Sequence, residues 1–177
     1  MLSVAICIIK IKSAIKLIFN WRLFMSKIPE GYTSLTPFIV FDDAAAVIEL
    51  YKKALGADVI TTMPSPEGDI KYAELQIGNA MLMIGTPHSE AGVEKTKSAK
   101  SLGGSPISFY VYVEDVQASF NKAKDAGMSE KQGIEDMFWG DRMGTLVDPF
   151  NIEWTIAEHV RDVSSEEMEE AMKKMAV

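Results

Sequence analysis

Side chains that bind metals or form covalent links are scarce in this chain. Its 177 residues include one cysteine, Cys7, and two histidines, His88 and His159. A single cysteine cannot form an internal disulfide, so we expect a packed core to hold the fold and a reducing, cytoplasmic location. One cysteine and two separate histidines also cannot form a zinc site of the His/Cys type, and a metal would have to bind carboxylates.

A long hydrophobic run is also missing. The apolar stretch 2–9 is far shorter than the roughly 20 residues of a membrane-spanning helix, and lysines follow it instead of a small-residue cleavage site. Residues 1–24 contain four basic residues and no acidic one. They could form an organelle presequence or a membrane-surface helix, but they match no targeting template well. We therefore favour a non-functional extension upstream of Met25, and we expect one domain over residues 25–177 and no membrane partner.

Positive charge is in the minority. The chain has 18 Lys and Arg against 25 Asp and Glu, for a net charge of −7, and the part after residue 24 is more acidic still. A nucleic-acid partner is therefore not expected. With 47% hydrophobic and 24% charged residues, the composition is that of a globular protein and excludes disorder.

The chain contains a pattern of short strands and one helix that occurs twice. In the module 31–85, a β-rich run precedes a helix that Asp43 caps and Gly56 closes, and three strands follow. In the module 106–160, the same order returns, with a helix that Asp115 caps and Gly127 closes. The expected strands are 35–41, 58–63, 70–77 and 80–84 in the first module, and 106–113, 128–137, 143–147 and 152–157 in the second.

The two modules align at a constant offset. Phe41 falls on Val113 and Ile84 falls on Ile156, each 72 residues later. An internal duplication is the simplest explanation. The sequence thus predicts an α+β fold of two βαβββ modules with curved mixed sheets.

Two further segments complete this organisation. The linker 86–105 is polar and has no apolar period, so we expect a loop, with a lid as one option. Residues 164–175 begin with a capping box and carry a stripe of methionines, which predicts a C-terminal helix that docks on the body or on a second subunit.

Alternation within the strands separates two faces of each sheet. One helix can cover one face, so the more apolar set, which begins with Leu35, should lie under the helices. The other set should line a concave surface of mixed character that suits a small molecule. Its candidate ligand-binding residues are Thr36, Phe38, Tyr72, Glu74, Met83, Ser108, Tyr110, Tyr112, Glu153 and Thr155, and Met81 belongs to the same face.

Several polar residues could have either a functional or a structural role. Trp139 and Arg142 could lie at the rim of the concave surface and bind a planar anion, or Arg142 could pair with Asp141 or Asp148 in a turn. Tyr72 and Glu74 could orient a ligand or form an ordinary cross-strand contact.

Glu153 could be a buried base or an exposed carboxylate at a strand end, and we favour the second. His159 should follow the last strand as a capping or interface residue, and His88 should be solvated.

These segments resemble a known superfamily. The stretches "LTPFIVFDDAAAVIELYKKALGA", "KYAELQIGNAMLMIG", "FWGDRMGTLVDPFNIEW" and "HVRDVSSEEM" are similar to the vicinal-oxygen-chelate superfamily of glyoxalases, bleomycin-resistance proteins and dioxygenases, and most similar to its PhnB-like branch. The resemblance covers about residues 31–172. It implies two modules around a ligand cup, usually in a homodimer, and no particular reaction.

The superfamily's metal positions correspond here to Thr36, Met83, Ser108 and Thr155. Hydroxyls and a thioether cannot replace the carboxylate or imidazole ligands of a divalent cation. The sequence therefore predicts a metal-independent, small-molecule-binding homodimer without a cofactor. Two alternatives stay open: a metal-dependent lyase or dioxygenase that uses Glu74 or Glu153, and a structural dimer whose cup is filled by its own aromatic residues.

Overall fold

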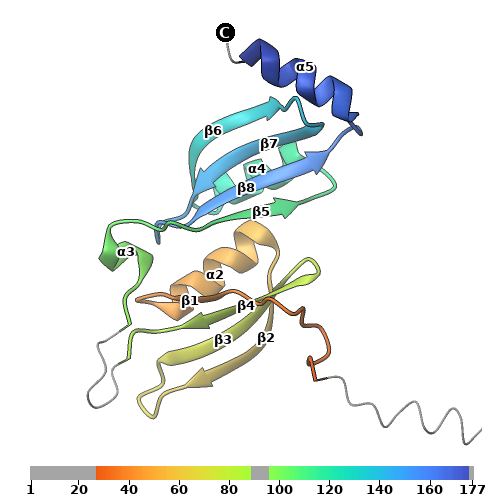
Figure 1. Cartoon of the computed structure of the whole chain (residues 1–177). Helices are drawn as coiled ribbons and strands as arrows, with labels where there is room; N and C mark the ends of the chain where they lie inside the picture. The colour runs from red at the N-terminus through yellow and green to blue at the C-terminus, as the bar shows by residue number, and fades with distance from the viewer. Residues whose placement is uncertain (1–26, 89–95, 176–177) are drawn as a thin grey trace, which may run out of the picture. The chain divides into compact units, whose positions relative to one another are not determined.

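The computed structural model describes residues 27–88 and 96–175. The chain divides into two compact units, Met1–Leu35 and Thr36–Val177, and the described helices and strands all lie in the second unit (Figure 1). The prediction for residues 1–24 falls outside the described residues.

The first module has the predicted βαβββ order. Its elements are β1 (Phe38–Val40), α2 (Ala44–Leu55), β2 (Asp58–Pro64), β3 (Ile70–Ile77) and β4 (Ala80–Gly85). The sheet order is β1-β4-β3-β2, with β1 parallel to β4 and the other pairs antiparallel. The side chain of Asp43 accepts the backbone N–H of Ala46 at 3.0 Å, and Gly56 ends the helix at a φ of 68°.

The second module repeats this arrangement. Its elements are β5 (Ser108–Tyr112), α4 (Val116–Asp125), β6 (Ser129–Asp136), β7 (Asp141–Val147) and β8 (Glu153–His159). The sheet order is β5-β8-β7-β6, and only β5 and β8 run parallel. Two mixed four-stranded sheets, each with a helix, confirm the predicted α+β fold.

Equivalent backbone contacts show the repeat in detail. The N–H of Phe41 donates to the carbonyl of Gly85 at 2.9 Å, and the N–H of Val113 donates to the carbonyl of Ala157 at 2.8 Å. Both partners of the second bond lie 72 residues after those of the first. The offset predicted from the sequence therefore holds at the level of single hydrogen bonds.

The core lies under the helices, as the alternation predicts. Ala73 and Leu75 in the first sheet and Trp154 and Ile156 in the second are almost fully buried. The prediction for Leu35 is wrong, because its side chain is 82% exposed. The first strand starts only at Phe38, since a proline at 37 has no N–H to donate and the sheet pairing begins after it.

The two modules contact each other through aromatic side chains. The ring of Tyr51 on α2 lies edge-on to Trp154 of β8 at a centroid distance of 5.1 Å. Phe41 meets Phe150 in the same manner at 5.7 Å. This packing holds Trp154 of β8 against α2 of the first module.

The linker contains more structure than expected. Residues Ala99–Leu102 form a short helix, α3, where the sequence predicts a loop. Ser98 explains the difference: its hydroxyl accepts the N–H of Ser101 at 3.1 Å and donates to Asp42 at 2.8 Å, and its side chain is buried. Residues 89–95 of the expected loop lie outside the described part of the chain.

The C-terminal helix α5 (Ser165–Met175) begins with the predicted capping box. Ser164 Oγ accepts the N–H of Glu167 at 3.2 Å, and the carboxylate of Glu167 accepts the N–H of Ser164 at 2.9 Å. Within its described residues no side chain of this helix is fully buried by its own chain, and Met168 and Ala171 are partly buried.

Candidate functional site

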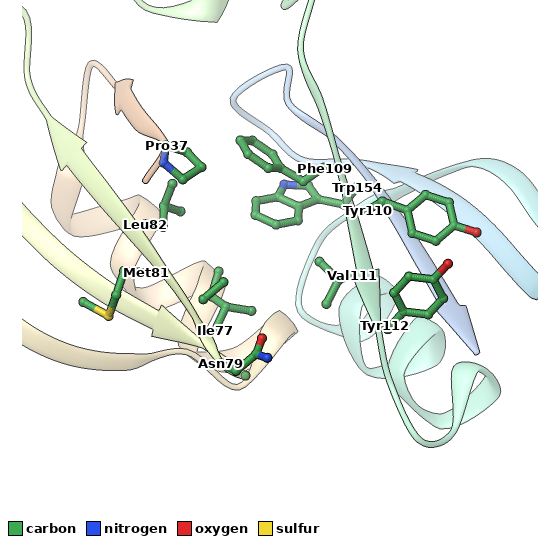
Figure 2. A pocket seen from close by; sticks show the side chains of 12 residues that line it. Pro37, Ile77, Asn79, Met81, Leu82, Phe109, Tyr110, Val111, Tyr112 and Trp154 are labelled. Atoms are coloured by element: carbon green, nitrogen blue, oxygen red, sulfur yellow. The ribbon is translucent and has the colours of Figure 1, made fainter. Parts of the chain in front are cut away.

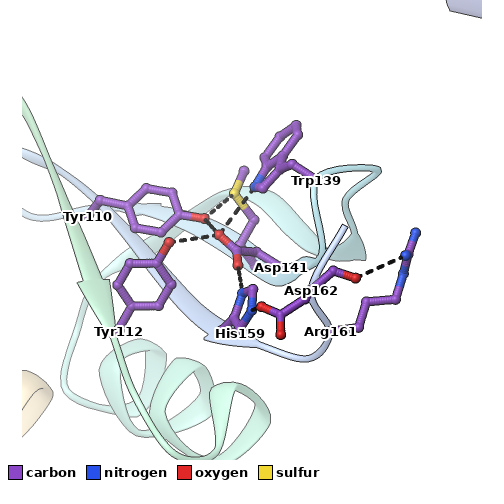
Figure 3. Close-up of polar contacts among 8 residues, drawn as sticks. Tyr110, Tyr112, Trp139, Asp141, His159, Arg161 and Asp162 are labelled. Carbon is purple, nitrogen blue, oxygen red and sulfur yellow. Dashed lines mark hydrogen bonds and ion pairs between the residues drawn. The ribbon is translucent and has the colours of Figure 1, made fainter. Parts of the chain in front are cut away.

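A buried carboxylate lies at the start of β7, on the face of the second sheet that α4 does not cover. Asp141 is 3% exposed, and its Oδ2 atom accepts hydrogen bonds from the hydroxyls of Tyr110 and Tyr112, both at 2.9 Å (Figure 3). The indole N–H of Trp139 donates to the same oxygen at 3.2 Å. The Nδ1 atom of His159 lies 2.9 Å from the other oxygen, Oδ1. We call these five residues the Asp141 cluster.

The strand order brings these side chains together. Tyr110 and Tyr112 alternate along the edge strand β5, so both rings leave the same face of the sheet. Since β8 lies between β5 and β7, the rings extend across β8 to reach Asp141. Ala157 stands opposite Tyr112 on β8, and its small side chain leaves room for this crossing.

The turn before β7 directs Asp141 inward. Gly140 has a φ of 98°, which only glycine adopts without strain, and its carbonyl accepts the backbone N–H groups of Val160 and Arg161. These bonds tie the β6–β7 turn to the end of β8. As a result, Asp141 and His159 stand opposite each other in the sheet register.

His159 faces carboxylates on both sides of its ring. Its Nε2 atom lies 3.1 Å from Asp162, while Nδ1 faces Asp141. Ionised carboxylates only accept hydrogen bonds, so both bonds form together only when both ring nitrogens carry protons. The geometry therefore favours the imidazolium form.

The pKa directions agree with this arrangement. Burial opposes ionisation of Asp141, but the hydrogen bonds from His159 and the two tyrosines outweigh it and lower the pKa of its carboxyl group. Hydrogen bonds to Asp141 and Asp162 raise the pKa of His159. Desolvation and donation to Asp141 raise the pKa of Tyr110 to about 12, so this hydroxyl stays protonated at neutral pH.

The first sheet carries a smaller polar pair on the corresponding face. The hydroxyl of Tyr72 donates to Glu74 at 2.6 Å, and the ring of Phe38 stacks on Tyr72 at a centroid distance of 6.4 Å. Tyr72 and Glu74 are thus in contact, as expected from their shared face. Within one chain they do not join the Asp141 cluster.

A cavity of about 340 Å³ lies between the two modules. It opens between β4 and the edge strand β5, and its walls are mainly apolar (Figure 2). Met81 and the two tyrosine hydroxyls point away from each other across it (Figure 2). The concave faces of the two sheets therefore do not line one common cavity in a single chain. The lining residues include Pro37, Ile77, Met81, Leu82, Phe109, Tyr110, Val111, Tyr112 and Trp154.

Arg142 is not at the site. Its guanidinium binds both oxygens of Asp136, at 2.6 and 3.0 Å, instead of Asp141 or Asp148. It follows Asp141 on β7 and so belongs to the opposite, helix-side set of residues, where its partner across the sheet is Glu158. The predicted role in anion binding has no support from this placement.

Glu153 is partly exposed and forms an ion pair with Lys131. This matches the interpretation as a carboxylate at a strand end rather than a buried base.

The four positions that correspond to the superfamily's metal site do not fit a divalent cation. Thr36, Ser108 and Thr155 offer neutral hydroxyls, and Met83 offers a thioether. The nearest acid across the strands from Met83 is Glu74, which Tyr72 already engages. In the part of the chain that the structure describes, no three His, Cys, Asp or Glu residues are grouped as a metal site.

Sequence reasoning missed two members of the Asp141 cluster. Asp141 is expected in a turn and His159 after the last strand, but each is an end residue of its strand, opposite the other in the register. The alternation along the strands already contained this information. Asp141 lies two residues before Met143 and His159 lies four residues after Thr155, so each pair shares one face of its strand. Extending the two strands by two residues each would have placed both on the concave face.

Sequence comparison now identifies the superfamily. A model of the Glyoxalase/Bleomycin resistance protein/Dioxygenase superfamily matches residues 33–156. The chain belongs to this superfamily. An uncharacterized protein of Mycobacterium bovis is 36% identical to this chain over 139 residues, which cover 78% of this chain and 91% of the relative. An uncharacterized protein of Mycobacterium tuberculosis has the same identity over 82% of its length.

Solved structures agree on the superfamily fold. TioX from Micromonospora sp. ML1 is 20% identical with a TM-score of 0.57, and a gene product from Arabidopsis thaliana is 24% identical with the same score. Each alignment covers 72% of this chain and 99% of the other. At these identities the likeness shows the fold alone. Among the described helices, none is long and apolar enough to span a membrane.

Proposed function

We propose that this protein binds a small organic molecule at the Asp141 cluster, and that binding requires no divalent metal. The observation that carries the proposal is the position of the cluster. A nearly buried carboxylate with four donors stands on the open face of a sheet, under two tyrosines whose side chains are partly exposed. Ordered polar groups beside accessible aromatic rings are typical of ligand sites.

The burial of Asp141 beside exposed tyrosine rings supports a role beyond folding. Burial of a carboxylate is unfavourable unless hydrogen bonds compensate for lost solvation. The Asp141 cluster supplies those bonds from three separate elements, yet Tyr110 and Tyr112 remain 44% and 62% exposed. A purely structural carboxylate would not need two rings that face solvent.

The ligand-binding form in this proposal is a homodimer in the cytoplasm. Phe38 on the first sheet is 53% exposed, as exposed as the tyrosines on the second sheet, and the cavity between β4 and β5 is mainly apolar. A second copy would cover these surfaces and could bring the first sheet of one chain over the second sheet of its partner. The four quoted sequence segments lead us to include membership of the PhnB-like branch in the proposal.

A second candidate function is a structural dimer whose concave surfaces fill each other. The contact between Phe38 and Gly85 favours it: a Cβ atom at Gly85 would lie 2.6 Å from the Phe38 ring, so that ring already fills part of its own face. In this case the dimer would bind no small molecule.

Native mass spectrometry of the full chain, purified without added ligand, tests the proposal. We expect a dimer that carries a co-purifying small molecule. The Tyr112→Phe variant should carry less of this molecule, and the surface variant Lys124→Ala should carry as much as the parent chain. A dimer that carries no small molecule and shows no thermal shift with a metabolite library would support the structural alternative instead.

A further inference from the structure

The hydrogen-bond donors of the Asp141 cluster are directed at carboxylates, and the Tyr110 hydroxyl has the sulfur of Met143 as a second acceptor at 3.3 Å. The hydroxyls of Tyr110 and Tyr112 each have one proton, and both donate to Asp141. The indole N–H of Trp139 donates to the same oxygen, and both nitrogens of His159 face carboxylates. Within these five described residues no donor is left for a ligand.

Some hydrogen-bond acceptors of the cluster remain available to a ligand. Each tyrosine oxygen keeps lone pairs after its proton is engaged, and these can accept a bond from a ligand N–H or O–H group. The two rings lie 5.2 Å apart, tilted by 53°, so a ligand cation beside the hydroxyls would also contact aromatic faces. The cluster thus offers acceptors and π surfaces.

The charges around the cluster have one dominant sign. A shallow hollow of about 610 Å³ beside Tyr112 and His159 is also lined by Glu114 and by Glu158, whose carboxylate belongs to the helix side and accepts the N–H of Val116 at 3.2 Å. The positive charge of His159 lies between Asp141 and Asp162.

The two nearby arginines are also engaged elsewhere. Arg142 pairs with Asp136, and Arg161 pairs with Glu167 of α5. An anionic ligand would therefore meet acceptors and negative charge, whereas a cation would meet complementary groups.

We infer that the ligand of the Asp141 cluster is an organic cation with N–H donors, such as an aryl-alkyl ammonium. This inference rests on the proposed ligand-binding function and names its chemical class. The ammonium donates to the oxygens of Tyr110 and Tyr112, and Asp141 orients those oxygens by holding their protons. The result reverses the preference for a planar anion that the sequence suggested through Arg142.

Three matched probes test the class. 2-Phenylethylamine carries an ammonium with three N–H donors, its N,N,N-trimethyl derivative keeps the charge without a donor, and 3-phenylpropionate carries a carboxylate on the same ring and linker. Binding to the full chain is measured by chemical-shift changes of the Trp139 indole N–H, assigned with a Trp139→Phe variant. We expect the ammonium to bind best, the trimethyl derivative more weakly and the carboxylate least.

Variants locate the contact. Tyr112→Phe keeps the ring and removes one acceptor, so it should weaken ammonium binding about tenfold and affect the trimethyl derivative less. Asp141→Asn should weaken both cations, and Tyr112→Phe keeps the test valid if Asp141→Asn fails to fold. The control Lys124→Ala, on α4, should leave all three affinities unchanged.

Each failure has a separate meaning. Equal or tighter binding of the carboxylate, or no effect of Tyr112→Phe on the ammonium, overturns the cation inference. If none of the probes binds but an anionic or neutral molecule co-purifies with the chain, the inference fails and the proposed ligand-binding function stands. If no molecule co-purifies or binds at all, the proposed function itself fails.

Discussion

The hydroxyl of Tyr51 donates a 2.6 Å hydrogen bond to Oδ2 of Asp148, a residue 97 positions later in the chain. Tyr51 belongs to the helix of the first module and Asp148 to the β7–β8 turn of the second. The same carboxylate oxygen accepts the indole N–H of Trp154 at 3.1 Å, and Oδ1 accepts the N–H groups of Phe150 and Ile152. A fully buried, fully bonded carboxylate therefore links the modules.

Tyr51→Phe should lower the free energy of unfolding by about 1.5 to 3 kcal/mol, the range for a lost bond to a charged group. The ring packing against Trp154 is retained, so the change isolates the hydroxyl. Urea denaturation followed by circular dichroism measures it. Tyr112→Phe is the matched control, and because Tyr112 is 62% exposed its cost should stay below about 1 kcal/mol. Equal effects of the two variants would contradict the role of Asp148 as a link.

Gly140→Ala should destabilise the protein more than Gly68→Ala does. Both glycines have similar positive φ angles, 98° and 95°, so the backbone strain of an alanine is matched. A Cβ at Gly140 would lie 2.1 Å from the carbonyl oxygen of Arg161, whereas nothing lies within 4 Å of one at Gly68.

We expect about 1 to 2 kcal/mol for Gly68→Ala from strain alone and at least about 1 to 3 kcal/mol more for Gly140→Ala from the clash. Thermal and urea unfolding of both variants measure the difference. A smaller loss at Gly140 than at Gly68 would mean that the β6–β7 turn can move away from Arg161.

The pair of Asp141 and His159 should make stability depend on pH. The pKa of His159 is raised in the folded chain, so its stabilisation is complete below the unfolded value of about 6.5 and is lost as the pH rises through the folded value. His159→Gln removes this contribution. The gap in melting temperature between the two proteins should therefore be wider at pH 5.5 than at pH 9.

Melting curves of the parent chain and His159→Gln at both pH values give the gap directly, and effects common to both proteins cancel. A gap that does not change with pH would show that folding leaves the pKa of His159 unchanged, and a gap that is narrower at pH 5.5 would show that the fold favours the neutral ring. The lowered pKa of Asp141 acts in a different range, because its stabilisation is lost only as the pH falls below about 4.

Divalent metals should not stabilise the protein. A ligand that binds only the folded state must raise the melting temperature. Since Thr36, Met83, Ser108 and Thr155 offer no charged ligand, zinc, nickel or manganese should produce no shift, and elemental analysis after native purification should give well under one ion per chain. One tightly bound ion per chain with a clear shift would instead favour the metal-dependent alternative.

The sequence predicted the fold well because its signals were local and repeated. The caps Asp43 and Asp115 and the closing Gly56 mark the helices correctly, and the alternation of apolar residues identified the buried face. The predictions were wrong where contacts between residues far apart in the sequence determine the local structure. Ser98 caps a helix inside a polar segment, and its hydroxyl donates to Asp42, 56 residues earlier in the chain.

The candidate site was harder to predict than the fold. Tyr110, Tyr112 and Trp139 were found from parity and from aromatic character, but their common partner Asp141 was assigned to a turn. Arg142 was selected because it is a cation next to aromatic residues, yet a one-residue step along a strand moves a side chain to the other face. Its partner, Asp136, is apparent only from the pairing of β6 with β7.

The 72-residue repeat has a consequence for how this chain diverged. The equivalents of Tyr110 and Tyr112 in the first module are Phe38 and Val40, which have no hydroxyl to donate, whereas the equivalent of Asp141 is another aspartate, Asp69. After a duplication, one copy can keep an apolar surface while the other gains polar groups one substitution at a time. An ancestor with two identical modules would have had either two such clusters or none, so the present asymmetry records specialisation of a single half.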